Sequence, residues 1–126
     1  MTISNAIDTA RLVRPNKIPF ELYLYWINEI EGRIQADVFL LESSDIHRYT
    51  MQDKDVTLLA KFPHENIYVD YLVMQIDYYN KETELYAVSR ANFEESYTRF
   101  VKWYVDSYVP ANDIPEYEQE ESIYGN

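Results

Sequence analysis

Apolar residues recur at spacings of three and four along most of this chain, which is the pattern of helices that bury one face. The first such face is short, and its positions are Ile3, Ile7, Ala10 and either Arg11 or Val13. Thr2 or Ser4 can cap the first turn by accepting a backbone N–H bond. Pro15 ends the segment, because the residue before a proline avoids helical backbone angles. The pattern predicts a first helix over residues 2–13.

A second stripe runs for about six turns beyond Pro19, a residue that suits the first turn of a helix. Its apolar positions are Phe20, Tyr23 or Leu24, Ile27, Ile30, Ile34, Val38 and Leu41, with Tyr25 and Trp26 beside them. Gly32 lies inside this helix, at a cost of about 1 kcal/mol relative to alanine. A helix keeps such a glycine where another backbone crosses closely or where its axis bends, and we expect a close crossing at Gly32.

The helical period fails between residues 43 and 62, where polar residues dominate. They include Ser43, Ser44, Asp45, Gln52, Asp53, Lys54 and Asp55. A connection of about 20 residues inside a compact domain is usually functional or contains small elements of its own. Residues 55–60 combine β-branched and apolar side chains and predict a short strand, with residues 47–50 as its candidate partner.

Two further stripes follow, and the break between them is short enough for an antiparallel helical hairpin. Pro63 begins the third helix, which we expect Asn80 to end in a left-handed turn. Thr83 is the expected cap of the fourth helix, and Pro110 its expected end. The third stripe uses Ile67 or Tyr68, Tyr71 or Leu72, Gln75 or Ile76, and Tyr79; the fourth uses Tyr86, Phe93, Tyr97, Phe100, Tyr104 and Tyr108.

These patterns predict one all-α domain, a small helical bundle of about four helices with a loop or short β excursion around residues 43–62. The helical domain covers residues 1–109, and residues 110–126, which lack a helical period, form an extended acidic C-terminal arm. Only two glycines occur in 126 residues, which disfavours the tight turns of an all-β fold. The 13 tyrosines suit either interfaces or the edge of a core.

Nothing in the residue pattern marks a catalytic, cofactor or metal site. The chain has no cysteine, and its two histidines, His47 and His64, would need Asp45 or Glu65 to complete a metal site. Two glycines cannot build a Gly-rich phosphate loop, and no glycine elbow surrounds the serines at positions 43 and 44. We therefore expect solvated histidines, no metal, no cofactor and no enzymatic activity.

Paired carboxylates are the remaining route to hydrolytic chemistry. Glu29 and Glu31 are too close in sequence to face each other on a helix, whereas Asp70 and Asp77 can share a face two turns apart. Helix faces that point to water carry such residues in any case. We expect these carboxylates to be solvated.

The net charge of −11 disfavours tight binding to duplex DNA. Residues 9–20 carry Arg11, Arg14 and Lys17 and no acid, whereas residues 110–126 carry five acids and no base. These three basic residues are a candidate inter-subunit contact, since the two segments can meet between copies packed side by side; alternatively, the acidic arm is simply solvated. No apolar run approaches the ~20 residues of a membrane helix, and we expect no signal peptide.

The chain contains four groups of residues whose order and spacing, taken together, are fairly specific for one protein family. They are residues 2–8 (TISNAID) leading to 14–16 (RPN), residues 25–34 (YWINEIEGRI), residues 63–71 (PHENIYVDY) with 75–80 (QIDYYN), and residues 92–93 (NF) with 100–104 (FVKWY). In these groups the chain resembles the head–tail connector (adaptor) proteins of tailed bacteriophages and prophages. The likeness covers residues 2–109.

The resemblance implies a small helical subunit of a homo-oligomeric ring, commonly twelve-fold, that docks beneath the portal protein in the virion. Such a ring extends the channel through which double-stranded DNA passes without specific binding, and carries a stopper or tail-completion protein. The subunit would occupy the host cytoplasm before assembly, and the family has no catalytic residues to transfer. An acidic chain agrees with this role, because a repulsive wall lets a polyanion slide.

The acidic arm falls outside the likeness. We expect Tyr117, Ile123 and Tyr124 to dock on the portal or on a neighbouring subunit and to become ordered only on assembly. The alternative function, from another class, is a small cytoplasmic helical module that binds or regulates one partner through its tyrosine-rich face.

Overall fold

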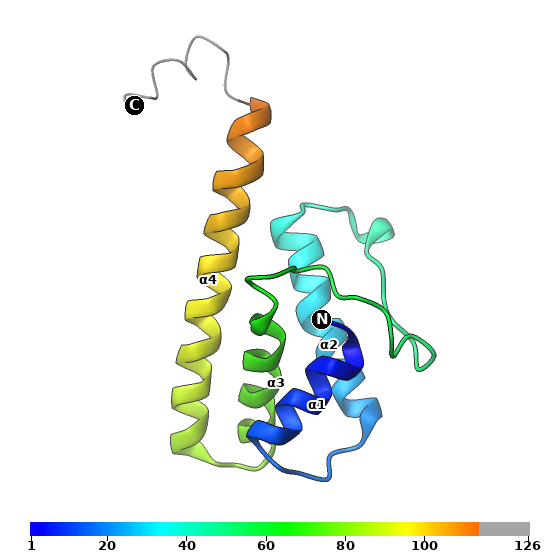
Figure 1. Cartoon of the computed structure of the whole chain (residues 1–126), viewed down its shortest axis with the longest axis vertical. Coiled ribbons are helices and arrows are strands. Elements are labelled where there is room, and N and C mark those ends of the chain that lie inside the picture. Colours follow the sequence, from blue (N-terminus) through cyan, green and yellow to red (C-terminus); the bar gives the residue numbers. More distant parts are fainter. Residues whose placement is uncertain (114–126) are drawn as a thin grey trace.

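The computed structural model describes residues 1–113, and the predicted all-α bundle is confirmed within them. The helices are α1 (Ile3–Val13), α2 (Phe20–Arg33), α3 (Asn66–Tyr79) and α4 (Thr83–Asp113), with a π-helical turn at Ile34–Val38 and a 3-10 turn at Ser43–Asp45. Helices α3 and α4 form the expected antiparallel hairpin, and α1 and α2 pack against α3 (Figure 1). The C-terminal part of α4 projects past the ends of the other helices.

Helix α3 lies at the centre of the bundle because it is apolar on almost every side. Its buried residues are Ile67, Tyr68, Val69, Tyr71, Leu72, Val73, Met74, Ile76 and Asp77. Phe93, Tyr97 and Phe100 of α4 are buried as their stripe predicts. Two isoleucines of α1, Ile3 and Ile7, complete the core from the other side. The hydrophobic effect on these faces holds the helices together.

The N-terminus is fixed by a cap and by the middle of the chain. The Thr2 hydroxyl accepts the backbone N–H of Asn5 at 3.1 Å, and the Asn5 side chain accepts the N–H of Thr2 at 3.2 Å. The next two backbone N–H groups, of residues 3 and 4, donate to the carbonyls of Val56 and Lys54. The predicted cap at Thr2 is confirmed, and the start of α1 is joined to the long connection.

The predicted strands do not form within residues 1–113. Thr2 and Thr57 make an isolated antiparallel bridge, and the rest of residues 43–62 is loop and turn. The backbone of His47 and Tyr49 pairs with side chains of the second helical segment instead of with a strand, as described below. The β-branched composition of residues 55–60 was a misleading signal, because packing and not propensity decides strand pairing.

The predicted close crossing at Gly32 is wrong. A Cβ placed on Gly32 would meet no atom within 4 Å outside its own helix. The helix instead loosens just after it, into the π-helical turn at Ile34–Val38, where the N–H of Phe39 bonds to the carbonyl of Ile34 at 3.0 Å. The glycine therefore lies beside a local change in helical winding and not at a packed contact.

The turn between α3 and α4 differs by one residue from the prediction. Asn80 keeps φ at −86°, and Lys81 is the residue with positive φ, at 59°. The N–H of Glu82 bonds to the carbonyl of Asp77 at 2.9 Å, and the N–H of Lys81 to the carbonyl of Tyr78 at 3.1 Å. These two bonds form a Schellman motif, which satisfies the last carbonyls of α3 and reverses the chain.

Pro110 does not end the fourth helix. Helix α4 continues to Asp113, so the predicted boundary between residues 1–109 and 110–126 falls inside it. A proline removes one intrahelical hydrogen bond and crowds the preceding turn, but a helix with about seven turns before it can tolerate that cost. Residues 114–126, the rest of the predicted arm, lie outside the described residues.

Candidate interaction groove

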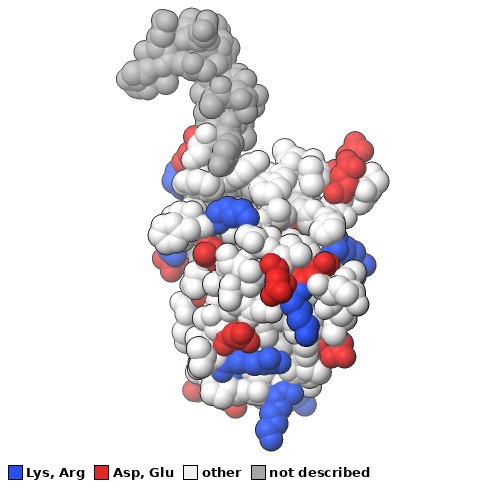
Figure 2. All heavy atoms as spheres, turned by 45° about the vertical axis from the view of Figure 1, so that its right-hand side comes forward, with Lys and Arg blue, Asp and Glu red and all other residues white. Residues whose placement is uncertain are grey.

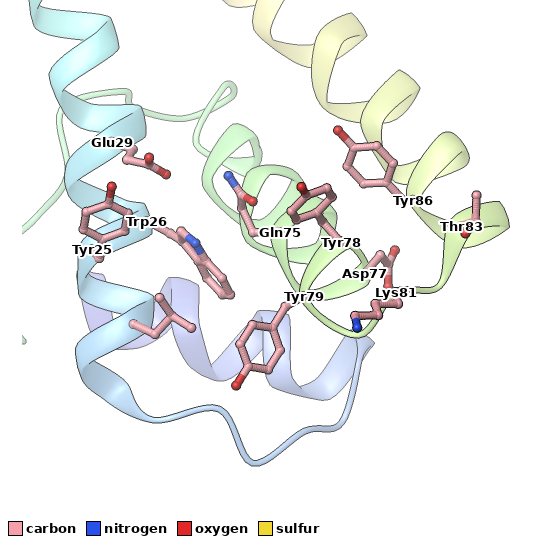
Figure 3. Close-up of a pocket in the computed structure, with 11 residues that line it drawn as sticks. Tyr25, Trp26, Glu29, Gln75, Asp77, Tyr78, Tyr79, Lys81, Thr83 and Tyr86 are labelled. Atoms are coloured by element: carbon pink, nitrogen blue, oxygen red, sulfur yellow. The ribbon is translucent and has the colours of Figure 1, made fainter.

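A groove with a volume of about 750 Å³ opens between α2, the C-terminal end of α3 and the start of α4 (Figure 3). We call it the aromatic groove. It is lined by Leu22, Tyr25, Trp26, Glu29, Gln75, Asp77, Tyr78, Tyr79, Lys81, Thr83 and Tyr86. Tyr25, Tyr78 and Tyr79 are 56%, 67% and 53% exposed, which is unusual for large aromatic side chains that line one groove.

The aromatic rings are held in place by one another and by the turn that follows α3. Trp26 is 7% exposed and packs edge-on against Tyr23 at 5.7 Å and against Tyr79 at 6.3 Å between ring centroids. Tyr78 contacts Tyr86 across the α3–α4 hairpin at 5.4 Å. The Schellman motif fixes the backbone that carries both tyrosines of α3. The groove is therefore largely preformed, which lowers the entropic cost of binding.

Two polar side chains of the groove, Glu29 and Gln75, are already bonded to Tyr71. The Tyr71 hydroxyl, from the inner side of α3, donates to the Glu29 carboxylate at 2.9 Å and accepts from the Gln75 amide at 2.8 Å. Burial raises the pKa of Tyr71, so its hydroxyl stays protonated and remains a donor. With Glu29 and Gln75 paired, and with aromatic rings forming much of its lining, the groove offers a mainly apolar surface to a ligand.

The predicted basic segment lies beside this groove, and its residues have different environments. The Arg14 guanidinium binds the Asp77 carboxylate through Nε to Oδ1 at 2.8 Å and Nη2 to Oδ2 at 3.2 Å. Arg11 donates to the carbonyl of Ile18 at 2.9 Å and lies over a tyrosine ring of α2. Lys17 is exposed. Two of the three predicted contact residues therefore also stabilise the subunit itself, and their inter-subunit role stays a prediction.

Asp77 is 1% exposed, so the expectation that it is solvated is wrong. The same holds for Glu31, which is fully buried. Asp70 is partly buried and accepts the Ser96 hydroxyl of α4 at 2.9 Å. These carboxylates can lie on helix faces turned toward the protein because hydrogen-bond donors from other segments pair with them there. The spacing of apolar residues in the sequence does not reveal those donors.

Glu31 is the centre of a buried hydrogen-bond network. Its Oε1 accepts the Tyr68 hydroxyl at 2.6 Å, and its Oε2 accepts the Tyr49 hydroxyl and the Leu59 N–H, each at 2.8 Å. The Tyr68 hydroxyl in turn accepts the N–H of Ala60 at 2.7 Å. Burial raises the pKa of Glu31, and its hydrogen bonds lower it by less. The network joins α2, α3 and the long connection.

Two amide side chains take the place of a neighbouring strand. Asn28 bonds both backbone groups of Tyr49, at 3.1 and 2.8 Å, and Gln35 bonds both backbone groups of His47, at 3.0 and 2.8 Å. The two amides are seven residues apart, so they lie on one face, with Glu31 between them. This polar row holds the connection against the helix, and we call it the clamp.

The remaining sequence predictions about chemistry can be placed in the fold. Among the described residues no group of three or more histidine, aspartate and glutamate side chains is arranged to hold a metal ion. The His47 ring contacts Tyr49, and the His64 ring contacts Trp103. No described helix is both long enough and apolar enough to cross a membrane. The predicted docking residues of the arm lie outside the described residues; they are Tyr117, Ile123 and Tyr124.

Comparisons with protein-family models, with curated proteins and with solved structures gave no match to this chain. The functional argument therefore depends on the resemblance in its sequence and on the surfaces of its fold. The sequence did not reveal the groove, although one signal was present: adjacent tyrosines at 78 and 79 cannot both point into the same core from a helix.

Proposed function

We propose that this chain is a structural subunit of a phage head–tail connector ring, which docks on the portal protein, extends the DNA channel and carries a stopper or tail-completion protein. The aromatic groove is the observation that carries the proposal. Tyrosine and tryptophan are enriched at protein interfaces, where they combine a large apolar area with a polar group. A preformed row of exposed tyrosines favours a role in assembly.

A ring also needs two different surfaces on each subunit, because a head-to-tail contact repeats around an axis until it closes. The groove lies at the end of the bundle where α3 turns into α4 (Figure 1). At the other end, α4 projects beyond the bundle, and two of its apolar residues, Trp103, whose ring contacts His64, and Val105, are 37% and 43% exposed. The subunit thus has distinct apolar surfaces at its opposite ends, as the proposal requires.

The charge distribution agrees with a conduit for DNA. Figure 2 shows lysine and arginine side chains interspersed with acidic ones over the face in view, without an extended basic area. A chain with net charge −11 is not suited to hold a polyanion, but it can form a wall past which DNA moves. The proposal involves no catalytic step and no cofactor.

Electron microscopy of the chain co-expressed with the portal proteins encoded near it tests the proposal. The expected result is a ring of density on the portal. Tyr78→Glu, at an exposed site in the groove, should prevent the ring without changing the circular-dichroism spectrum, because it places a charge in the contact. Met51→Glu is the control, since Met51 is 40% exposed in the long connection and belongs to neither of the two apolar surfaces.

The second candidate is a small helical module that binds one partner. The volume of the groove favours it, because 750 Å³ falls within the range of about 300–1,000 Å³ typical of ligand pockets. A folded chain that forms no ring with any neighbouring portal, yet binds another single partner through the groove, would replace the connector proposal with this one.

A further inference from the structure

We propose that the aromatic groove of each subunit receives residues 114–126 of a second copy, with Tyr117, Ile123 and Tyr124 as the side chains that enter it. This inference rests on the proposed ring and specifies the contact that would hold neighbours together. It assigns one occupant to the exposed tyrosines and one function to the acidic arm.

The first argument is reach. Tyr86, at the groove, and Asp113, at the end of α4, are 27 residues apart in one helix, which corresponds to about 40 Å along its axis. Tyr117 is four residues beyond Asp113 and can lie at most about 14 Å from it. It therefore cannot enter the groove of its own chain. Tyr124 could do so only if the intervening residues were almost fully extended back along α4.

A neighbouring copy removes this restriction. If the groove end of one subunit lies beside the projecting end of α4 in another, a few residues of the arm cover the distance. The contact then joins two different surfaces, the groove of one subunit and the arm of the next. A contact of this kind is heterologous, and it generates a closed ring when the rotation between neighbours divides a full turn.

The second argument is chemical complementarity. The groove is mainly apolar and aromatic, and the arm contributes two tyrosines and two isoleucines among mostly polar residues. The arm also carries four glutamates and no base between residues 114 and 126. Lys81 lies at the groove, and Lys17 is exposed in the connection next to it. An acidic segment would meet these cations at the rim, while its apolar side chains meet the tyrosines.

Cross-linking between single-cysteine variants tests the inference, because the natural chain has no cysteine. Ser122→Cys places a thiol beside two of the arm's apolar residues, and Thr83→Cys places one at the groove without removing an aromatic ring. The two full-length variants are mixed and treated with a short bismaleimide. Only a contact between different chains can join them. Phe62→Cys, paired with Ser122→Cys, measures random encounter at an exposed site.

The expected result is a dimer yield about tenfold above that of the Phe62→Cys pair, since docking raises the local thiol concentration. The double variant Thr83→Cys with Ser122→Cys should give a ladder of multimers. Equal yields for the two pairs, or cross-links of the double variant only within one chain, would overturn the inference. A ring seen by microscopy without the cross-link would refute the arm contact and leave the ring. A cross-link without a portal-bound ring would support the arm contact and count against the connector.

Discussion

Replacing Arg14 by methionine should destabilise the fold far more than its position in a short connection suggests. Methionine keeps much of the aliphatic packing of the arginine side chain but removes both N–H donors. The Asp77 carboxylate, 1% exposed, loses both of the hydrogen bonds described for it. A buried charge without a partner is costly, and breaking such a pair costs about 3–5 kcal/mol.

Because the Arg14 side chain is itself 29% exposed, water can replace part of the lost interaction, and we expect a value near the lower end, about 3 kcal/mol. This is a large part of the total for a domain of this size, which is typically about 5–15 kcal/mol. Lys17→Met is the control. Lys17 is exposed in the same connection, so its replacement should change the free energy of unfolding by less than about 0.5 kcal/mol.

The assay is urea denaturation followed by far-UV circular dichroism and by tryptophan fluorescence, at concentrations too low for self-assembly to add stability. Asp77→Asn and the double variant complete a double-mutant cycle. The loss in the double variant should be smaller than the sum of the single losses by about 2 kcal/mol. The reasoning is refuted if Arg14→Met costs no more than Lys17→Met, or if the two single losses are additive.

Three further substitutions test local features by the same assay. Gly32→Ala should raise the free energy of unfolding by about 0.5–1 kcal/mol, because a Cβ at this position meets no neighbouring atom. A lower free energy of unfolding would contradict this account, because it would mean that the Cβ is in contact with another atom. Lys81→Gly should stabilise by about 0.5–1 kcal/mol by removing the strain of positive φ, and no gain would contradict this account. Burial raises the pKa of Glu31, so the folded state binds that proton more tightly and loses stability as the pH rises from about 4.5 toward the raised value. The stability of the natural chain relative to Glu31→Gln should therefore fall over this window, and a flat difference would exclude a raised pKa.

The helices were predictable because each one shows apolar residues at spacings of three and four within its own segment of the sequence. The stripes of α1 and α4 correctly identify part of the core, and the cap at Thr2 follows from a hydroxyl at the right position. The stripe residues that are buried are Ile3, Ile7, Ala10, Phe93, Tyr97 and Phe100. The turn after α3 was placed one residue early, since Asn80 and Lys81 can both end a helix and only the hydrogen bonds of the Schellman motif decide between them.

The candidate groove and the buried carboxylates were not predictable in the same way. Glu31 lies between Ile27 and Ile34 on the apolar stripe, but its donors come from residues 49, 59 and 68, and no local pattern brings these to it. Tyr78 and Tyr79 form a groove only because α2 and the start of α4 stand on either side of them. Such features depend on how the helices are placed relative to one another. The spacing of apolar residues along a single helix does not determine that placement.

The clamp has a consequence for how the bundle opens. The backbone of His47 and Tyr49 is held by side chains of the second helical segment, and Leu59 by the carboxylate between them. Amide protons at these three positions can exchange with solvent only when the helix that carries Asn28 and Gln35 releases them. The long connection therefore belongs to the same cooperative unfolding unit as α2, although most of it contains no regular secondary structure.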